Sequence, residues 1–328
     1  MSETRDPRPR RRRLSRMGLG LLVLIAVIGY FAVQRYSNGG MGAPYCTARA
    51  TGAGSASEGT VQSYEMSPEQ AANAATIAAV GIAKGLPDRA VTIALATAMQ
   101  ESALRNLDHG DRDSLGLFQQ RPSQGWGTPE QIMDPVYSAG IFYDRLAEIK
   151  GYTRLPLTVA AQKVQLSGFP QAYAKHETDA TVVTAAFGDN GTATLTCSGP
   201  APAAPGDPAK VKAELERAFG KEALHEVRDG APGGRSAPGR PIREAEVSVQ
   251  LKPEGGAAAE ARRGRAMAHW AVAHARELGI ARVSYGMRGW VSGRDGDEWQ
   301  FKGGTGAKDG DGDPHNAGPG EVRIFIAR

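Results

Sequence analysis

The sequence has little of what a nucleic-acid-binding protein needs. Aromatic residues make up only 6% of the chain, and much of its formal charge of +4 comes from the first 16 residues. Beyond that tail there is no basic stripe interleaved with aromatic side chains, and the short patch at Arg262, Arg263 and Arg265 is typical of a solvated helix start. We therefore expect no nucleic-acid partner.

Long uncharged runs are equally scarce, and the chain has one near its start. Residues 17–33, MGLGLLVLIAVIGYFAV, directly follow the arginine-rich residues 1–16. A helix of that length rises about 25 Å, which is enough to cross a thin bilayer. Because arginines resist translocation, the pattern predicts a single-pass signal anchor in the cell membrane, with a cytoplasmic N-terminus and an extracytoplasmic remainder. A cleaved signal peptide is the alternative, although no A-x-A pattern precedes Gly39.

Cysteine is nearly absent, and the two that occur, Cys46 and Cys197, bracket one stretch of chain. Disulfides persist in oxidising compartments, where we expect this part of the protein to lie. The spacing predicts a disulfide that joins the two ends of a domain, and closing so long a loop contributes about 4 to 5 kcal/mol in the loop-entropy model. Two unpaired thiols are the alternative.

Helix signals recur between the cysteines. Ser67-Pro68-Glu69-Gln70 offers an N-cap, a proline at the first helical position and a capping-box glutamine, and residues 128–131 repeat the pattern. Further helices are expected from about 87, 134 and 157, and a last one over 170–187. Without convincing strand alternation, we expect residues 67–197 to form an all-α domain preceded by a linker at 34–66.

Residues after 197 show a different pattern. A Pro/Ala-rich linker at 198–207 is followed by residues 208–328, where alternation predicts strands over 247–251, 281–285 and 322–326. Helices are expected over 208–224 and 260–278, and a flexible loop over 229–241. This is typical of a small α+β domain with Trp270, Trp290 and Trp299 in its core. The complete prediction is a multidomain chain: one transmembrane helix, an all-α domain and a small α+β domain.

One acidic residue stands out in the helical part. Glu101 follows an apolar helical run and lies close in sequence to Met99, Leu104 and, after a charged loop, Leu117 and Phe118. Apolar surroundings disfavour the ionised form of a carboxyl group, and a general acid must be protonated to act. A solvated acid at a helix end is the simpler interpretation of Glu101 taken alone.

The spacing around Glu101 resembles the motif of the lytic transglycosylase family, which is goose-type lysozyme-like. That motif is Glu-Ser at a helix end, a short loop, and Gly-Leu-Met-Gln-x-x-Pro; here Glu101-Ser102 precedes GLFQQRP at 116–122, with Phe118 in place of the methionine. The resemblance covers about residues 68–192, where DPVYSAGIFYDRL and AAQKVQLSGFPQAYAKHE also look like segments of actinobacterial cell-wall proteins. The late Ala-Tyr-Asn-x-Gly motif of the family is only echoed by residues 187–191.

The resemblance implies cleavage of the β-1,4 bond between N-acetylmuramic acid and N-acetylglucosamine in peptidoglycan. Glu101 would protonate the leaving oxygen and then accept the proton of the muramic-acid 6-hydroxyl, which forms a 1,6-anhydro product. One acid is then sufficient, and no cofactor or metal is required. The positions that match the family's substrate-binding residues are Ser102, Gly116, Phe118, Gln119 and Asn190, and Ser102 is also expected to hold Glu101.

Two other functions stay open. If Asp108, Asp111 or Asp113 were held about 6.5 to 9.5 Å from Glu101, it could activate water, and the protein would be an inverting muramidase. The simpler role for these aspartates is in a turn. A catalytically inactive peptidoglycan-binding scaffold of the cell envelope is the second alternative.

The C-terminal residues look like an accessory domain of secreted actinobacterial cell-wall proteins and are similar to the D-alanyl-D-alanine carboxypeptidase scaffold. That scaffold's zinc ligands are missing, because His269 and His274 are five residues apart on the expected helix and Glu321 and Arg323 replace the histidines of the last strand. We therefore expect a non-catalytic module that binds the wall or an envelope protein. Asp309, Asp311 and Asp313 resemble the start of a calcium loop, but Pro314 and Gly320 occupy positions that such a loop needs for glycine and an acid.

Overall fold

The computed structural model describes residues 43–51, 60–166, 170–188, 193–221, 224–230, 244–253, 255–293, 298–301, 317–318 and 320–328. The membrane anchor predicted at 17–33 lies outside these ranges. Within them, no helix is both long enough and apolar enough to cross a bilayer. The described residues between 44 and 328 form one compact unit.

The predicted helices of the first part are present, with boundaries close to those expected. Ser67 and Thr128 are N-caps of complete capping boxes, in which Gln70 and Gln131 return the second hydrogen bond. The expected final helix is divided in two, because a 3-10 helix precedes α7. The elements are α2 (Pro68–Ala83), α3 (Asp88–Ser102), η1 (Pro122–Gln124), α4 (Pro129–Ile132), α5 (Pro135–Glu148), η2 (Tyr152–Arg154), α6 (Leu157–Gln165), η3 (Pro170–His176) and α7 (Glu177–Phe187).

The all-α prediction for this part is wrong. An antiparallel sheet of order β2-β1-β3 packs against α7, and it is built from β1 (Tyr45–Thr51), β2 (Val61–Met66) and β3 (Thr194–Ser198). Two of these strands lie in the segment expected to be a linker. The predicted disulfide is confirmed: Cys46 and Cys197 are register partners on β1 and β3, and their sulfurs are bonded.

The C-terminal part contains a larger sheet than predicted. Six antiparallel strands run in the order β4-β5-β9-β6-β7-β8, where three strands were expected. Part of the expected loop at 229–241 belongs to β4, and the rest of that loop, residues 231–241, lies outside the described ranges. The elements are α8 (Pro208–Phe219), β4 (Leu224–Gly230), β5 (Glu244–Leu251), α9 (Gly256–Ala273), α10 (Ala275–Leu278), β6 (Ile280–Tyr285), β7 (Arg288–Val291), β8 (Gln300–Phe301) and β9 (Glu321–Ala327).

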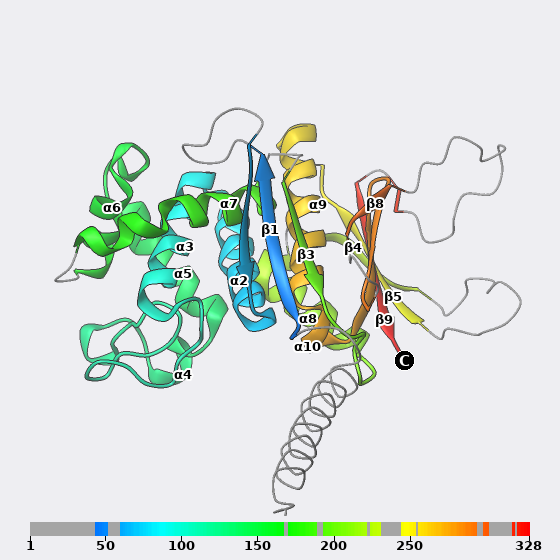
Figure 1. Ribbon diagram of the computed structural model, residues 1–328, viewed down its shortest axis with the longest axis horizontal. Helices are drawn as coiled ribbons and strands as arrows, with labels where there is room; N and C mark the ends of the chain where they lie inside the picture. The colour runs from blue at the N-terminus through cyan, green and yellow to red at the C-terminus, as the bar shows by residue number, and fades with distance from the viewer. Residues whose placement is uncertain are drawn as a thin grey trace, which may run out of the picture. The chain divides into compact units, whose positions relative to one another are not determined.

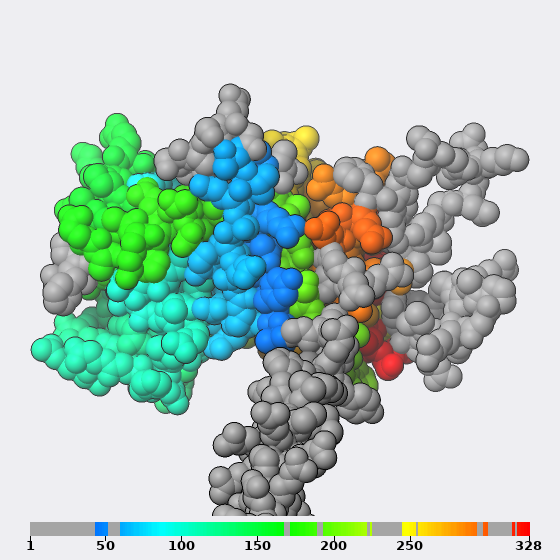
Figure 2. Space-filling view, viewed as in Figure 1, coloured from blue at the N-terminus to red at the C-terminus, as the bar shows by residue number. Residues whose placement is uncertain are grey.

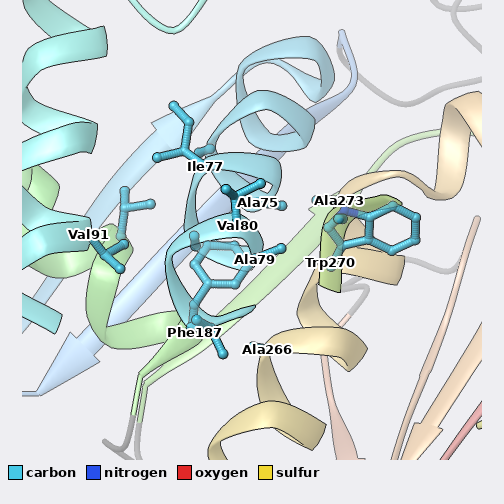
Figure 3. Packing of buried hydrophobic residues seen from close by; sticks show 14 of the residues in the cluster. Ala75, Ile77, Ala79, Val80, Val91, Phe187, Ala266, Trp270 and Ala273 are labelled. Carbon is cyan, nitrogen blue, oxygen red and sulfur yellow. The ribbon is translucent and has the colours of Figure 1, made fainter. Parts of the chain in front are cut away.

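The two parts share one core, which is the main departure from the predicted fold class. Figure 1 shows the helices α3, α5 and α6 on the left, then α2 and the three-stranded sheet, then α8 and α9, and the six-stranded sheet on the right. Helix α2 packs against α3 and α5 on one side and α8 and α9 on the other. In Figure 3 its side chains, such as Val80, lie between Val91 of α3 and Trp270 of α9. The fold is therefore an α+β arrangement rather than an all-α domain joined to a separate small one.

Polar contacts reinforce this shared core. Arg262, expected to be solvated, is 15% exposed and bonds both Asp88 and the carbonyl oxygen of Leu86 at the start of α3. Farther along α9, Arg265 donates to the carbonyl oxygen of Gly188 at 3.0 Å. One face of α9 is thus bonded to the ends of two helices in the first part.

The surface view places the three-stranded sheet between the two parts. In Figure 2 the residues of β1 and β2 form a blue band between the cyan and green helical residues and the orange and red C-terminal strands. Trp299, just before β8, donates its indole N–H to the carbonyl oxygen of Leu195 on β3 at 2.9 Å. The small sheet therefore bonds directly to the C-terminal part.

Candidate active site

Glu101 lies in the last turn of α3, where the chain reverses through two left-handed residues. Ala103 and Leu104 have φ angles of 52° and 60°, a region that residues other than glycine seldom adopt. The side-chain amides of Gln70 and Asn73 on α2 donate to their two carbonyl oxygens, each at 2.8 Å. These hydrogen bonds from α2 offset the conformational free energy that the two left-handed residues cost. They also hold the end of α3 in place.

The carboxylate of Glu101 has a specific partner. The hydroxyl of Tyr173, on η3, donates to Oε1 of Glu101 at 2.7 Å, and Tyr173 is only 1% exposed. Glu101 itself is half-buried. One residue earlier, the side chain of Gln100 contacts Nε2 of His176 at 3.3 Å, so η3 is bonded to the end of α3 at two points. Partial burial lowers the pKa of His176, which favours its neutral form.

Ser102 positions the helix end rather than the carboxylate. It is buried, and its hydroxyl lies 2.8 Å from the carbonyl oxygen of Leu117 and 3.1 Å from that of Ala98. The expected support of Glu101 is therefore indirect, since Ser102 joins α3 to the loop that contains the Gly-Leu-Phe-Gln motif.

That loop is a tight reversal closed by a two-way backbone bridge between Leu115 and Gln120, with both hydrogen bonds at 2.9 Å. Gly116 has φ +75°, and a Cβ there would lie 2.7 Å from the carbonyl oxygen of Ile132, so glycine is required. Gln120 is buried and donates to the carbonyl oxygen of Ser138 on α5. The motif thus forms a rigid turn beside the end of α3.

The two predicted substrate contacts in the turn differ in exposure. Phe118 is fully buried and stacks on Phe142 of α5 with ring centroids 4.6 Å apart, so its side chain belongs to the core behind the turn. Gln119 is half-buried with φ +47°, and its side-chain amide makes only long bonds, of 3.3 and 3.4 Å, to backbone carbonyls. Gln119 can exchange these weak bonds for bonds to a ligand. Asn190 lies outside the described residues.

The loop aspartates have local roles. Asp113 accepts from the backbone N–H of Ser123 at 2.9 Å and from Arg121 at 2.7 Å. Hydrogen bonding to the Ser123 side chain, then to Arg121 and to the Ser123 backbone, holds the pKa of Asp113 well below its usual range. Asp108 is exposed and bonds only its neighbour His109 at 2.7 Å, which lowers the pKa of Asp108. Asp111 is exposed as well. Nothing in these contacts directs one of the three toward Glu101.

Two residues that sequence reasoning missed complete the site. Tyr173 belongs to the segment AYAKH, which resembles part of actinobacterial cell-wall proteins, but the resemblance assigns no role to the tyrosine. Gln165, at the end of α6, donates to the carbonyl oxygen of Phe118 at 2.7 Å and so supports the turn from the other side. Neither residue could be paired with its partner from spacing, because the partners lie 72 and 47 positions away.

His269 on α9 and His274, which caps the end of that helix, do not lie in a metal-ligating arrangement. His269 is bonded to the carbonyl oxygen of Ala186, while His274 stacks on Trp270 and bonds that residue's carbonyl oxygen at 2.9 Å. Burial lowers the pKa of both histidines to about 4. In the part of the chain that the structure describes, no group of three or more His, Cys, Asp or Glu side chains could hold a metal ion. The calcium-like residues 309–313 lie outside that part.

In comparisons with known proteins, no family model matches this chain and no curated protein matches it.

Proposed function

We propose that this protein is a peptidoglycan lytic transglycosylase, with Glu101 as its single acid and base. The observation that carries the proposal is the carboxylate of Glu101, half-buried at a rigid helix end, hydrogen-bonded by buried Tyr173 and placed next to the glycine-closed turn of residues 115–120. Such an arrangement fixes the orientation of one carboxyl group, which proton transfer to a glycosidic oxygen requires.

The reaction needs two proton transfers, both through the carboxyl group of Glu101. Because Tyr173 donates to Oε1, we assign the transferable proton of Glu101 to Oε2. Oε2–H protonates the oxygen that leaves as the N-acetylglucosamine hydroxyl when the bond to the muramic-acid anomeric carbon breaks. The carboxylate then accepts the proton of the 6-hydroxyl as that oxygen bonds the anomeric carbon, which gives a 1,6-anhydro ring and regenerates the acid.

The contacts of the loop aspartates favour transglycosylation over hydrolysis with a second acid. An inverting enzyme needs a carboxylate that can activate water, whereas Asp113 is already engaged by Arg121 and Ser123 and Asp108 by His109. Gln119 is the residue of the turn that we assign to substrate binding. The disulfide supports a compartment outside the cytoplasm, where peptidoglycan lies.

The test compares the full chain with Glu101→Gln on purified sacculi, with release of muropeptides analysed by mass spectrometry. We expect anhydro-ended products from the unchanged protein and a loss of at least about a hundredfold in Glu101→Gln, which is the usual contribution of a general acid. Glu148→Gln, an exposed acid at the end of α5, is the matched control and should retain full activity.

Full lysis by Glu101→Gln would overturn the proposal. Products with reducing ends would replace transglycosylation by hydrolysis. Binding to sacculi without any product from the unchanged protein would identify it as an inactive wall-binding scaffold.

A further inference from the structure

Strand β2 (Val61–Met66) is an edge of the three-stranded sheet. Within the described residues it pairs with β1 alone, because the strand order is β2-β1-β3. Its sequence, VQSYEM, contains no proline and no lysine, and its register with β1 continues without a bulge. Prolines, lysines and bulges usually keep other strands away from an edge, whose unpaired N–H and C=O groups are a template for a further strand. β2 lacks that protection.

The other edge strands that the structure describes are less suited to pairing. β3 is already contacted by the C-terminal part, since Trp299 donates its indole N–H to the carbonyl oxygen of Leu195. The register of β4 with β5 shifts between Leu224 and Glu226, and such an irregularity disrupts the ladder at an edge. β8 has only two residues. Among the described strands, β2 is therefore the edge most open to a partner.

The position of the disulfide shows which backbone groups of β2 point outward. The Cα atoms of Cys46 and Cys197 are 3.9 Å apart, which is the short spacing of a non-hydrogen-bonded pair. The backbone groups of Cys46 therefore point away from β3 and toward β2, where Met66 is its register partner. Because this direction alternates along a strand, every second residue of β2 directs its N–H and C=O to the open edge. These residues are Val61, Ser63 and Glu65, and their side chains are exposed.

A strand with this pattern is complementary to itself. When two copies of β2 lie antiparallel, with Ser63 opposite Ser63 of the partner subunit, each outward-directed residue has a hydrogen-bonded partner. In that register Val61 lies opposite Glu65 of the partner subunit. Glu65 is the only charged residue of β2, so no two like charges face each other across the contact.

The inner face of β2 fits the same register. Gln62 and Tyr64 lie on this face and are half-buried, and within the described residues Oε1 of Gln62 is buried without a hydrogen-bond partner. The register places Gln62 opposite Tyr64 of the partner subunit, in a pair whose Cβ atoms are about 4.5 to 5.5 Å apart. A tyrosine hydroxyl can donate to an amide oxygen across such a pair. The contact therefore supplies a donor for an acceptor that lacks one, on each side of the twofold axis.

We propose that this edge is a contact between two copies of the chain, in which the β2 strands pair antiparallel about Ser63 and join two three-stranded sheets into one. This twofold arrangement uses the same strand of both copies and leaves no β2 edge for a third. Neither Glu101 nor the turn of residues 115–120 takes part in it, so the proposal does not depend on the proposed function.

The first test is a disulfide between the two copies. In the proposed register the Cα atoms of residue 63 in the two chains are about 5.5 Å apart, within the range of about 4.4 to 6.8 Å that a disulfide spans. The purified full chain with Ser63→Cys, mildly oxidised, should therefore run as a covalent dimer in non-reducing electrophoresis. Gln124→Cys, at an exposed position of η1, is the control and should stay monomeric.

Sedimentation of the full chain measures the non-covalent contact. Ser63→Pro removes an outward N–H and leaves the hydrogen bonds to β1 in place, so we expect it to weaken dimer formation at least about tenfold. Ser63→Ala keeps that N–H and should leave dimer formation unchanged. Thermal unfolding of each variant checks that the fold is retained. Glu101→Gln should dimerise as the unchanged protein does, even if the proposed lytic activity fails.

A monomeric unchanged chain at the concentration used for cross-linking, or equal cross-linking of the two cysteine variants, would overturn the proposal. A dimer that persists in Ser63→Pro would also overturn it, because the contact would then lie elsewhere in the chain. If the monomeric chain instead bound N-acetyl-Thr-Val-Thr-Val-Thr-amide and Ser63→Pro abolished that binding, the edge would belong to a strand of a different partner and the second copy would be excluded.

Discussion

Tyr173 donates a hydrogen bond to Glu101 at 2.7 Å and so joins two segments that are 72 residues apart in sequence. The bond crosses from a 3-10 helix to the end of α3 and orients the carboxylate on which the proposed chemistry depends.

We predict that Tyr173→Phe lowers kcat about tenfold and has a smaller effect on KM. One hydrogen bond contributes about 0.5 to 1.5 kcal/mol, and 1.36 kcal/mol corresponds to a tenfold change in rate. The measurement is steady-state release of soluble muropeptides. Tyr137→Phe removes a weaker bond, at 3.3 Å to the carbonyl oxygen of Trp126, and serves as the control. Equal losses in the two variants would contradict a specific role for Tyr173.

Ser102→Ala tests how the turn is held against α3. The substitution removes the bond to the carbonyl oxygen of Leu117 and leaves a buried acceptor unsatisfied, so we expect the free energy of unfolding to fall by about 1 to 3 kcal/mol. Denaturant titration measures this change. Ser63→Ala, at an exposed position of β2, should change it by less than about 0.5 kcal/mol.

Arg262→Ala tests whether the two parts depend on each other. We expect it to lower the free energy of unfolding by about 1 to 3 kcal/mol, because it removes bonds to Asp88 and Leu86 across the shared core. Arg276→Ala, on the exposed side of α10, is the matched control. If the first part were independent of α9, the Arg262 variant would unfold in two transitions with an unchanged first part.

Because His269 and His274 are buried, we predict that the folded protein becomes less stable as the pH falls. The pKa of both His269 and His274 is about 4 in the folded protein, below the ordinary value of 6.5. Between these values the unfolded chain binds more protons than the folded one, so stability is fully present above about pH 6.5 and falls as the pH falls toward 4. Each histidine should account for about 1 to 2 kcal/mol between pH 7 and pH 5.

Urea unfolding measured over that pH range checks the expected slope. His274→Phe keeps an aromatic ring stacked on Trp270 and should reduce the slope. A pH-independent free energy of unfolding between pH 7 and pH 5 would contradict the assignment of two neutral buried histidines.

Reduction of the disulfide should lower the free energy of unfolding by up to about 4 to 5 kcal/mol, since the two cysteines are 151 residues apart. Thermal unfolding with and without a reductant, together with the double variant Cys46→Ala/Cys197→Ala, measures the effect. An unchanged melting temperature after verified reduction would show that the sheet alone holds the two strands.

Local sequence signals were sufficient to predict the helices and the turn beside Glu101. Capping residues such as Ser67 and Thr128 act within four positions, and Gly116 is needed by the backbone conformation of one residue. These features depend on near neighbours, which is why they could be predicted.

The strands of the small sheet could not be predicted from alternation. β1 is the central strand, and Cys46, Thr47 and Ala48 are buried in succession, so the usual alternation of buried and exposed residues is lost. β3 has only five residues. Two of the three unpredicted strands of the larger sheet, β7 and β8, are likewise short.

The shared core did have a signal in the sequence. In α2, AANAATIAAVGIA is apolar on nearly every side, and its residues 73 to 82 are all buried. A helix that is hydrophobic all round must be covered on more than one face. The second face of α2 is covered by α9, which lies within residues 208–328, and the sequence pattern predicts a separate domain there.

The covalent link between β1 and β3 has a mechanical consequence. Cys46 is the second residue of β1, so tension applied through the N-terminal segment reaches a sulfur–sulfur bond before it can peel that strand from the sheet. A protease that cuts once between residues 46 and 197 would likewise release neither fragment until the bond is reduced.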